Sequence, residues 1–310
     1  MKVSGIGEFG LIDEIRKINP VTNRQVVVGI GDDAAVVRGG GGKYILITTD
    51  TLVENVHFDP AYFTYYELGW KLLAANVSDI AAMGGDPGYA LVTLGLKKNA
   101  EVADIRDLYA GMKALSKKCG VDIVGGDIVR SPKNSFFTMA LFGSAKKVIK
   151  RSGARPGDQI VVVGWLGASA SGLANLKKYG RRALKMKGSN ARTHLMPLPM
   201  LEEGRRASKY ATSMIDNSDG LARCLLEICR SSGVGARIDL NTVPVAEGAT
   251  IRQALDGGED YNLILTVPKK KVGLIKNGIA IGEITASRKI ILINEHGKKI
   301  TMKNNGFIQF

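Results

Sequence analysis

The sequence predicts two α/β or α+β domains. Segments that read as apolar strands alternate with segments of helical periodicity in both halves of the chain. The length of 310 residues also exceeds the roughly 100–200 residues of a typical single domain. A basic segment that contains glycine and proline, residues 146–158, separates the halves. We therefore expect an N-terminal domain over residues 1–145 and a C-terminal domain over residues 146–310.

In the N-terminal half, two helices and several strands are expected. Residues 65–83 are predicted to be helical because Leu68, Leu72 and Ala75 recur at nearly the helical period. The same argument predicts a helix over 101–118. Apolar runs bounded by glycine turns predict strands, at 26–38 with a glycine–acid interruption, 43–49, 89–96, 121–124 and 136–145.

In the C-terminal half, the same signals continue. We expect helices near 168–179, 202–210 and 219–231. Short apolar runs predict strands, at 159–164, 212–216, 235–239, 261–267, 279–284 and 290–294.

Composition narrows the class of protein. No apolar run approaches the roughly 18 residues of a membrane helix, and residues 1–28 lack the layout of a signal peptide. The three cysteines, Cys119, Cys224 and Cys229, are sparse and have no CxxC spacing, which favours a reducing cytoplasm over a disulfide or zinc framework. We expect a cytoplasmic protein without a membrane partner.

The net charge of +14 indicates an anionic partner or simply a basic surface. Nucleic acid is one candidate. Aromatic residues, however, hardly interleave with the basic runs, as a base-stacking surface would require. We therefore expect no nucleic-acid partner.

Aspartates recur where predicted strands end, beside glycine turns or hydroxyl side chains. Any one of them could be a turn former or a helix N-cap. Such loops are also where α/β proteins place functional side chains. The set is Asp32, Asp33, Asp50, Asp127, Asp216 and Asp219, with Asp79 in or near a helix.

If these carboxylates converge, something must neutralise them. Two of them at 4 Å repel by roughly 4 kcal/mol at an effective dielectric of 20. Mg²⁺ binds carboxylate, hydroxyl and phosphate oxygens and is usually shared between a few carboxylates and a substrate phosphate. The aspartates of this basic protein therefore predict a Mg-nucleotide site.

Conventional nucleotide motifs do not account for such a site. There is no G-x-x-x-x-G-K-[ST] loop, and the G-x-G-x-x-G at Gly5, Gly7 and Gly10 has too few residues before it for a feeding strand. The Gly/Ser turn in 161–172 precedes a predicted helix whose N-terminus could bind phosphate, or the turn could serve packing alone. Among the histidines, His57 lies near the Asp50 loop, whereas His194 and His296 are expected at the surface.

The segments in order resemble the thiamine-monophosphate kinase family, within the superfamily of aminoimidazole-ribonucleotide-synthase-like ATP-using enzymes. The resemblance covers essentially the whole chain and rests on nine segments. They are GEFGLI (7–12), GIGDDAAVV (29–37), TTDTLVENVHF (48–58), NVSDIAAMGGDP (76–87), GGD (125–127), RSGARPGD (151–158), IDNSDGL (215–221), GGEDYNL (257–263) and GFIQF (306–310).

The resemblance implies ATP-dependent phosphorylation of thiamine monophosphate to thiamine diphosphate by a homodimer. It implies an N-terminal domain with a mixed sheet and helices, which binds Mg-ATP and pairs with the same domain of the second copy. It also implies a C-terminal α/β domain that completes the nucleotide and substrate site. The Mg²⁺ ligands that it implies, for several ions, are Asp33, Asp50, Asp79, Asp127, Asp216 and Asp219, with Thr48 and Thr49 assisting. The implied ATP contacts are Gly126, Asp127, Arg151 and Ser218, and the implied substrate contacts are His57, Glu259 and Phe307.

Such a reaction needs no general base, because the acceptor phosphate already carries an anionic oxygen, so we expect no catalytic base. Two alternatives stay open from the sequence. One is another enzyme of the superfamily, of the hydrogenase-maturation, selenophosphate or purine-pathway type, and the other is a basic nucleic-acid-binding protein.

Overall fold

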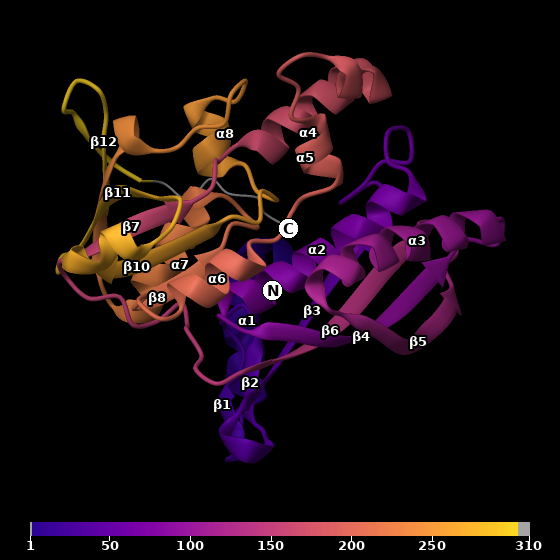
Figure 1. Ribbon diagram of the computed structural model, residues 1–310, viewed down its shortest axis with the longest axis horizontal. Coiled ribbons are helices and arrows are strands. Elements are labelled where there is room, and N and C mark those ends of the chain that lie inside the picture. The colour runs from indigo at the N-terminus through magenta and orange to yellow at the C-terminus, as the bar shows by residue number, and fades with distance from the viewer. Residues whose placement is uncertain (1, 303–310) are drawn as a thin grey trace.

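Two mixed sheets form the frame of the molecule. The computed structural model describes residues 2–302. A six-stranded sheet has the order β1-β2-β3-β6-β4-β5, and a seven-stranded sheet has the order β13-β12-β9-β11-β7-β10-β8. Figure 1 shows the first sheet at the right with α2 and α3 over it and the second at the left. The predicted pair of α/β domains is confirmed.

The N-terminal sheet is antiparallel except for one pair. Its strands are β1 (Val26–Val28), β2 (Ala35–Arg38), β3 (Tyr44–Val53), β4 (Asp86–Leu96), β5 (Asp122–Arg130) and β6 (Phe136–Ala145). Strands β4 and β5 are parallel, and α3 (Val102–Cys119) provides the crossover between them, as a parallel pair requires.

Helix α2 (Tyr65–Ala82) begins at a capping box. The Thr64 side chain accepts a hydrogen bond from the Glu67 backbone, and the Glu67 carboxylate accepts one from the Thr64 backbone. Helix α3 packs against α2 at a very close approach. A Cβ on Gly69 would lie 1.9 Å from the Leu108 carbonyl oxygen, and one on Gly111 would lie 1.9 Å from that of Tyr66. Both crossing points therefore require glycine.

Only one face of the N-terminal sheet is covered by these helices. Along β4, Ala90, Val92 and Leu94 are buried, as expected for alternate residues of a strand with one face in a core. On the opposite face, Tyr89 is 60% exposed and Leu91 is 41% exposed. The protein thus presents an open sheet face that carries large apolar side chains.

The C-terminal sheet is also antiparallel except for one pair, β9 and β12. Its strands are β7 (Asp158–Val163), β8 (Ser213–Asp216), β9 (Gly235–Asp239), β10 (Leu263–Pro268), β11 (Gly278–Thr285), β12 (Ile290–Ile293) and β13 (Lys299–Thr301). Its helices are α4 (Ala168–Tyr179), α5 (Ala191–Leu195), α6 (Leu201–Ala207), α7 (Leu221–Ser232) and α8 (Ile251–Asp256). Strand β8 lies at one edge of this sheet and ends at Asp216.

Several elements differ from the sequence prediction, among them β13, which was not expected. Helix α1 (Val3–Ile18), which contains a kink at Gly7 with φ of 65°, was not expected, and neither were α5 and α8. Strand β5 continues to Arg130 through the two glycines at which the predicted strand stopped. Among the described residues, no helix is long and apolar enough to cross a membrane.

Candidate active site

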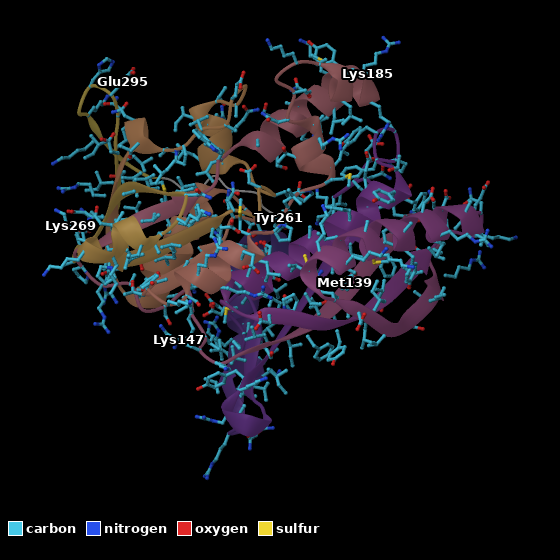
Figure 2. All side chains as sticks on the ribbon, in the orientation of Figure 1. Met139, Lys147, Lys185, Tyr261, Lys269 and Glu295 are labelled. Carbon is cyan, nitrogen blue, oxygen red and sulfur yellow. The ribbon has the colours of Figure 1, made fainter. Side chains whose placement is uncertain are left out.

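A cavity of about 1140 Å³ lies where the two halves meet. It is lined by α1, the β1–β2 loop, β3, α2, and the segment that joins β8 to α7. Tyr261, which also lines it, is labelled near this junction in Figure 2. Seven of the eight predicted metal ligands line this cavity: Asp33, Thr48, Thr49, Asp50, Asp79, Asp216 and Asp219.

Three carboxylates meet at the floor of the cavity. One oxygen each of Asp33, Asp79 and Asp216 lies within 4.8 Å of the other two. Asp33 follows the glycine turn after β1, Asp79 projects from α2, and Asp216 ends β8. The cluster therefore exists only because the N-terminal and C-terminal halves are packed together.

Local structure directs each of these side chains. The turn before Asp33 needs a glycine at Gly31, which has φ of 117° and lies so close to Arg16 that a Cβ would be 2.0 Å from its guanidinium nitrogen. Ala75 and Asp79 are four residues apart on α2, so they share one face of the helix and both line the cavity. Sheet register brings Asp216 opposite Leu263 of β10.

Hydrogen bonds hold the cluster from both halves. Thr48 donates to Asp79, and Ser78 donates to Asp216 across 2.7 Å. The guanidinium of Arg151 donates to one oxygen of Asp33 through Nε at 3.0 Å and Nη2 at 2.5 Å. The other oxygen of Asp33, Oδ2, is buried and has no hydrogen-bond partner among the described residues.

Burial makes ionisation of these carboxyl groups unfavourable, and their neighbours add to the effect. Burial raises the pKa of Asp216 to about 8, with the charge of Asp33 contributing. It raises the pKa of Asp32 to about 7 and that of Asp50 to about 6. The pKa of Asp79 is raised well above its ordinary value by burial and then by Asp50 and Asp216. The protein thus holds several carboxyl groups that favour neutralisation.

The donor set fits hard divalent cations. Carboxylate and hydroxyl oxygens are the ligands that Mg²⁺ prefers, and both kinds converge here from Asp33, Asp79, Asp216 and Thr48. The unpartnered Asp33 Oδ2 is the kind of buried atom that a cation would satisfy. None of the three cysteines is among the described residues that line the cavity, so no thiolate competes for the cation there.

Of the predicted nucleotide contacts, Arg151 and Ser218 line the cavity and Gly126 and Asp127 do not. Strand β5, which carries the latter two, is separated from β3 by β4 and β6. At roughly 4.8 Å per strand, that places β5 about 14 Å from β3. The pairing register also puts Asp127 in the row of Thr93, Thr138 and Thr51, on the opposite face of the sheet from the row of Asp50. Asp127 therefore does not reach Asp50 within one chain.

The predicted substrate residues His57 and Glu259 lie together in a second cluster that the sequence did not fully reveal. Lys71, a buried lysine of α2, is 2.8 Å from Glu259 Oε1. His194 Nδ1 is 3.4 Å from Glu259 Oε2. The pKa of His57 is lowered, mainly by burial. The charge of Glu259 opposes this shift in pKa, and that of Lys71 adds to it. The third predicted residue, Phe307, lies outside the described residues.

The expectation that His194 is a surface residue is wrong. Its side chain is buried beside Phe63 and Ser169, with Ser169 Oγ 2.9 Å from Nδ1. The five-residue helix α5 is too short to show a period that would have revealed a buried face. His296 is 80% exposed, as expected, and Cys224 and Cys229 are buried.

The N-terminus of α4 is already occupied by a protein carboxylate. Asp260 accepts hydrogen bonds from the backbone nitrogens of Gly167 at 2.6 Å and Ser169 at 2.7 Å. Of the two interpretations of this Gly/Ser turn, the structure favours packing over phosphate binding. Asp260 reaches it from a loop in which Glu259 and Tyr261 both have positive φ, 63° and 52°, a conformation that is uncommon for residues other than glycine.

Several charged residues that line the cavity were missed by the sequence prediction. Arg230 of α7 is 2.5 Å from Asp13 of α1, and Arg16, Glu8 and Glu227 line the same cavity. Their signal was weak because α1 itself was not predicted, so nothing placed its polar face near the aspartate loops.

Comparisons with known proteins show the family and the fold of the chain. Residues 31–145 match the family described as AIR synthase related protein, N-terminal domain. Residues 155–294 match AIR synthase related protein, C-terminal domain. The thiamine-monophosphate kinase of Salmonella typhimurium is 36% identical over 90% of this chain and 87% of that protein. That of Escherichia coli K12 is 34% identical over 98% of each.

A solved structure of AaThiL complexed with AMPPCP and TMP has the same fold. It covers 100% of this chain and 99% of that chain, with a TM-score of 0.88 and 31% sequence identity. The similarity therefore extends over both sheets.

Proposed function

The chain belongs to the thiamine-monophosphate kinase family, and from that premise we propose that it transfers the γ-phosphoryl group of ATP to thiamine monophosphate, giving thiamine diphosphate. The observation that carries the proposal is the meeting of Asp33, Asp79 and Asp216 beside Arg151 in a cavity shared by both halves. Full-length similarity to kinases of this acceptor favours it over the other acceptors of the superfamily.

We propose that the cavity carboxylates hold Mg²⁺, with more than one ion in the loaded enzyme. The ligands would be Asp33, Asp50, Asp79, Asp216 and Asp219, assisted by Thr48 and Thr49. When bound, Mg²⁺ neutralises phosphate charge and orients the transferring phosphoryl group. ATP brings about four negative charges and the acceptor about two, so an all-carboxylate floor without cations would repel both.

Arg151 supplies the fixed positive charge of the chain itself. In the ligand-free protein its guanidinium forms an ion pair with Asp33, and the side chain is only 19% exposed. Once cations neutralise Asp33, the same guanidinium is available to phosphate oxygens, which it can contact through two nitrogens. Ser218, on the same wall, would contact ATP as well.

No side chain needs to act as a general base in this reaction. The nucleophile is a phosphate oxygen that is already ionised, so catalysis consists of in-line positioning and stabilisation of charge on the transferring group. His57 and Glu259, together with Phe307, would position the thiamine part of the acceptor. The division of labour would be Mg-ATP binding and dimerisation by residues 1–145, with the site completed by residues 146–310.

Gly126 and Asp127 enter the site in this proposal from a second copy of the chain. The open sheet face that exposes Tyr89 and Leu91 also carries Asp127. Pairing two such faces would bury apolar area, which drives association, and would place Asp127 of each copy opposite the other sheet. Thr49 lies in the same row as Leu91 on this open face and also lines the cavity. A homodimer therefore accounts for a predicted ligand that the single chain cannot bring to its own cavity. The free cysteines are in keeping with a cytoplasmic location.

Binding and growth test the proposal before any rate is measured. Calorimetry with AMPPCP should show binding that requires Mg²⁺ and is weakened at least tenfold by Asp33→Asn. The gene should also restore growth of a strain that cannot make thiamine diphosphate. Mg-dependent AMPPCP binding without rescue, from protein that is soluble in that strain, would retain the nucleotide site and reject the acceptor.

A further inference from the structure

Lys71 is an unusual residue of α2, because its long charged side chain is entirely buried. Its exposed fraction is 0%, and it is among the largest fully buried side chains of the described residues. Lysine is almost never fully buried unless it is paired. It lies eight residues before Asp79, so it occupies the same face of α2 about two turns away. One helix face thus carries both a cavity carboxylate and this buried ammonium.

The partner of Lys71 is Glu259, which belongs to the other half of the molecule. The Nζ–Oε1 distance is 2.8 Å, and the ammonium lies 5.2 Å from the centroid of the Phe63 ring. Nζ has no hydrogen bond of good geometry among the described residues. The second oxygen of Glu259 faces His194 Nδ1 at 3.4 Å. Glu259 is itself 28% exposed, so its carboxylate is held from the buried side and open on the other.

Stability alone does not explain a buried lysine here. When both residues of a buried ion pair are replaced by apolar residues of similar volume, the protein is often as stable as before or more stable. The Nζ hydrogens make no hydrogen bond of good geometry among the described residues, which adds to the cost of burial. The arrangement is better explained by what it does to Glu259.

The loop that presents Glu259 is held in a specific conformation. Glu259 and Tyr261 both have positive φ. The Glu259 backbone N–H donates to the Ser218 carbonyl at 2.7 Å, and that of Tyr261 donates to the Asn217 carbonyl at 3.1 Å. Such backbone conformations persist only where the surroundings enforce them. The ion pair to Lys71 is a side-chain restraint from the opposite half of the protein.

We propose that Lys71 is a positioning residue for the acceptor, which fixes the carboxylate of Glu259 in the direction that selects the thiamine part of the substrate. The inference rests on the proposed function, since it takes Glu259 as an acceptor contact. Lys71 itself does not touch the reacting atoms. Its role is to set the orientation of Glu259 while α2 sets the position of Asp79.

Kinetics of charge-removing variants test this directly. Lys71→Met should raise KM for thiamine monophosphate at least tenfold, with Mg-AMPPCP affinity within twofold of wild type. Lys71→Gln, which can still donate to Glu259, should raise KM less. In a Glu259→Gln background, adding Lys71→Met should change KM by less than twofold, because the group to be positioned is already neutral.

A second lysine–glutamate pair supplies the matched control. Lys97 lies 2.7 Å from Glu54, and neither residue lines the cavity. Lys97→Met should leave KM for the acceptor within twofold of wild type. Two results would overturn the proposal: an unchanged KM in Lys71→Met, or a change in KM as large in the Glu259→Gln background as in wild type. The Lys71–Glu259 ion pair would then serve only to hold the two halves together.

Hydrogen exchange separates this inference from the proposed function. In the ligand-free protein, the amides of Glu259 and Tyr261 should exchange at least tenfold faster in Lys71→Met than in wild type, with no change in Lys97→Met. Equal protection in Lys71→Met and wild type would overturn the inference even in an active enzyme. Absence of thiamine diphosphate formation by wild type would instead reject the proposed function, whatever the exchange result.

Discussion

Asp79→Asn is expected to stabilise the metal-free protein while abolishing its activity. Asp79 lies within 4.8 Å of both Asp33 and Asp216 in the carboxylate cluster. At that distance, each ionised pair repels by about 3.5 kcal/mol at an effective dielectric of 20. Asparagine removes the charge and keeps an oxygen that accepts the hydrogen bond from Thr48.

Proton linkage sets the upper limit of this stabilisation. The pKa of Asp79 is raised in the folded protein above its ordinary value of 3.8. The folded state therefore binds a proton that the unfolded state releases, and stability falls as the pH rises from about 4 towards the folded-state pKa. Holding that proton costs at most about 5.7 kcal/mol at pH 8 and about 1.6 kcal/mol at pH 5. Because Asp79 faces the cavity and is partly screened by solvent, we expect about half of these values.

Urea unfolding in EDTA measures the effect. We expect the free energy of unfolding of Asp79→Asn to exceed that of wild type by about 2–3 kcal/mol at pH 8 and by less than 1 kcal/mol at pH 5. Saturating Mg²⁺ with AMPPCP should reverse the order, because the variant lacks a ligand. Asp107→Asn, at an exposed position of α3, should change stability by less than about 0.5 kcal/mol. A variant less stable than wild type in EDTA at pH 8 would refute the reasoning.

Further predictions concern the cations, the dimer, the helix crossing and the contact between the halves. The rise in melting temperature caused by Mg²⁺ with AMPPCP should be larger at pH 8 than at pH 6, because burial raises the pKa of Asp216 to about 8 and protons compete with cations below it; an equal or opposite pH trend in calorimetric scans would contradict this. Asp50→Asn and Asp127→Asn should each remain folded and lose most turnover. After subunit exchange, a mixture of the two variants should recover about one quarter of wild-type activity, because about half of the dimers are mixed and each mixed dimer keeps one complete site of two. No recovery would argue against a site shared between copies. Gly69→Ala should destabilise the protein by at least about 3 kcal/mol in urea unfolding, because its Cβ would lie 1.9 Å from a backbone oxygen; a loss below 1 kcal/mol would contradict the packing. Ser78→Ala should lower stability by about 1–3 kcal/mol at pH 8 by removing the donor to a buried carboxyl group, and unchanged unfolding would exclude that hydrogen bond.

The aspartates at predicted strand ends were readable from sequence because strand ends and turns have local signatures. Asp33, Asp50 and Asp216 each follow an apolar run, and all of them line one cavity. What local patterns did not contain is the sheet order. The position of Asp127 depends on three strand pairings and on the face of the sheet to which its side chain belongs. The residues near Asp127 in the sequence predict neither of these.

Lys71 and His194 show the complementary limit. A lysine in a helical pattern normally indicates a solvent-facing position, but this one is buried beside Phe63 and pairs with Glu259 of the C-terminal half. His194 lies in a five-residue helix whose sequence carries no period. Helix α1 was missed because Gly5, Gly7 and Gly10 weaken the helical signal. Each of these residues acquires its role from long-range contacts.

The most direct test of the central claim is an assay of the purified protein with ATP, Mg²⁺ and thiamine monophosphate, in which thiamine diphosphate is resolved by chromatography. Free thiamine in place of the monophosphate and omission of the metal are the controls. We expect product only with the monophosphate and metal together, in one-to-one ratio with ADP. Folded protein that binds Mg-AMPPCP but forms no thiamine diphosphate would contradict the assignment of the acceptor.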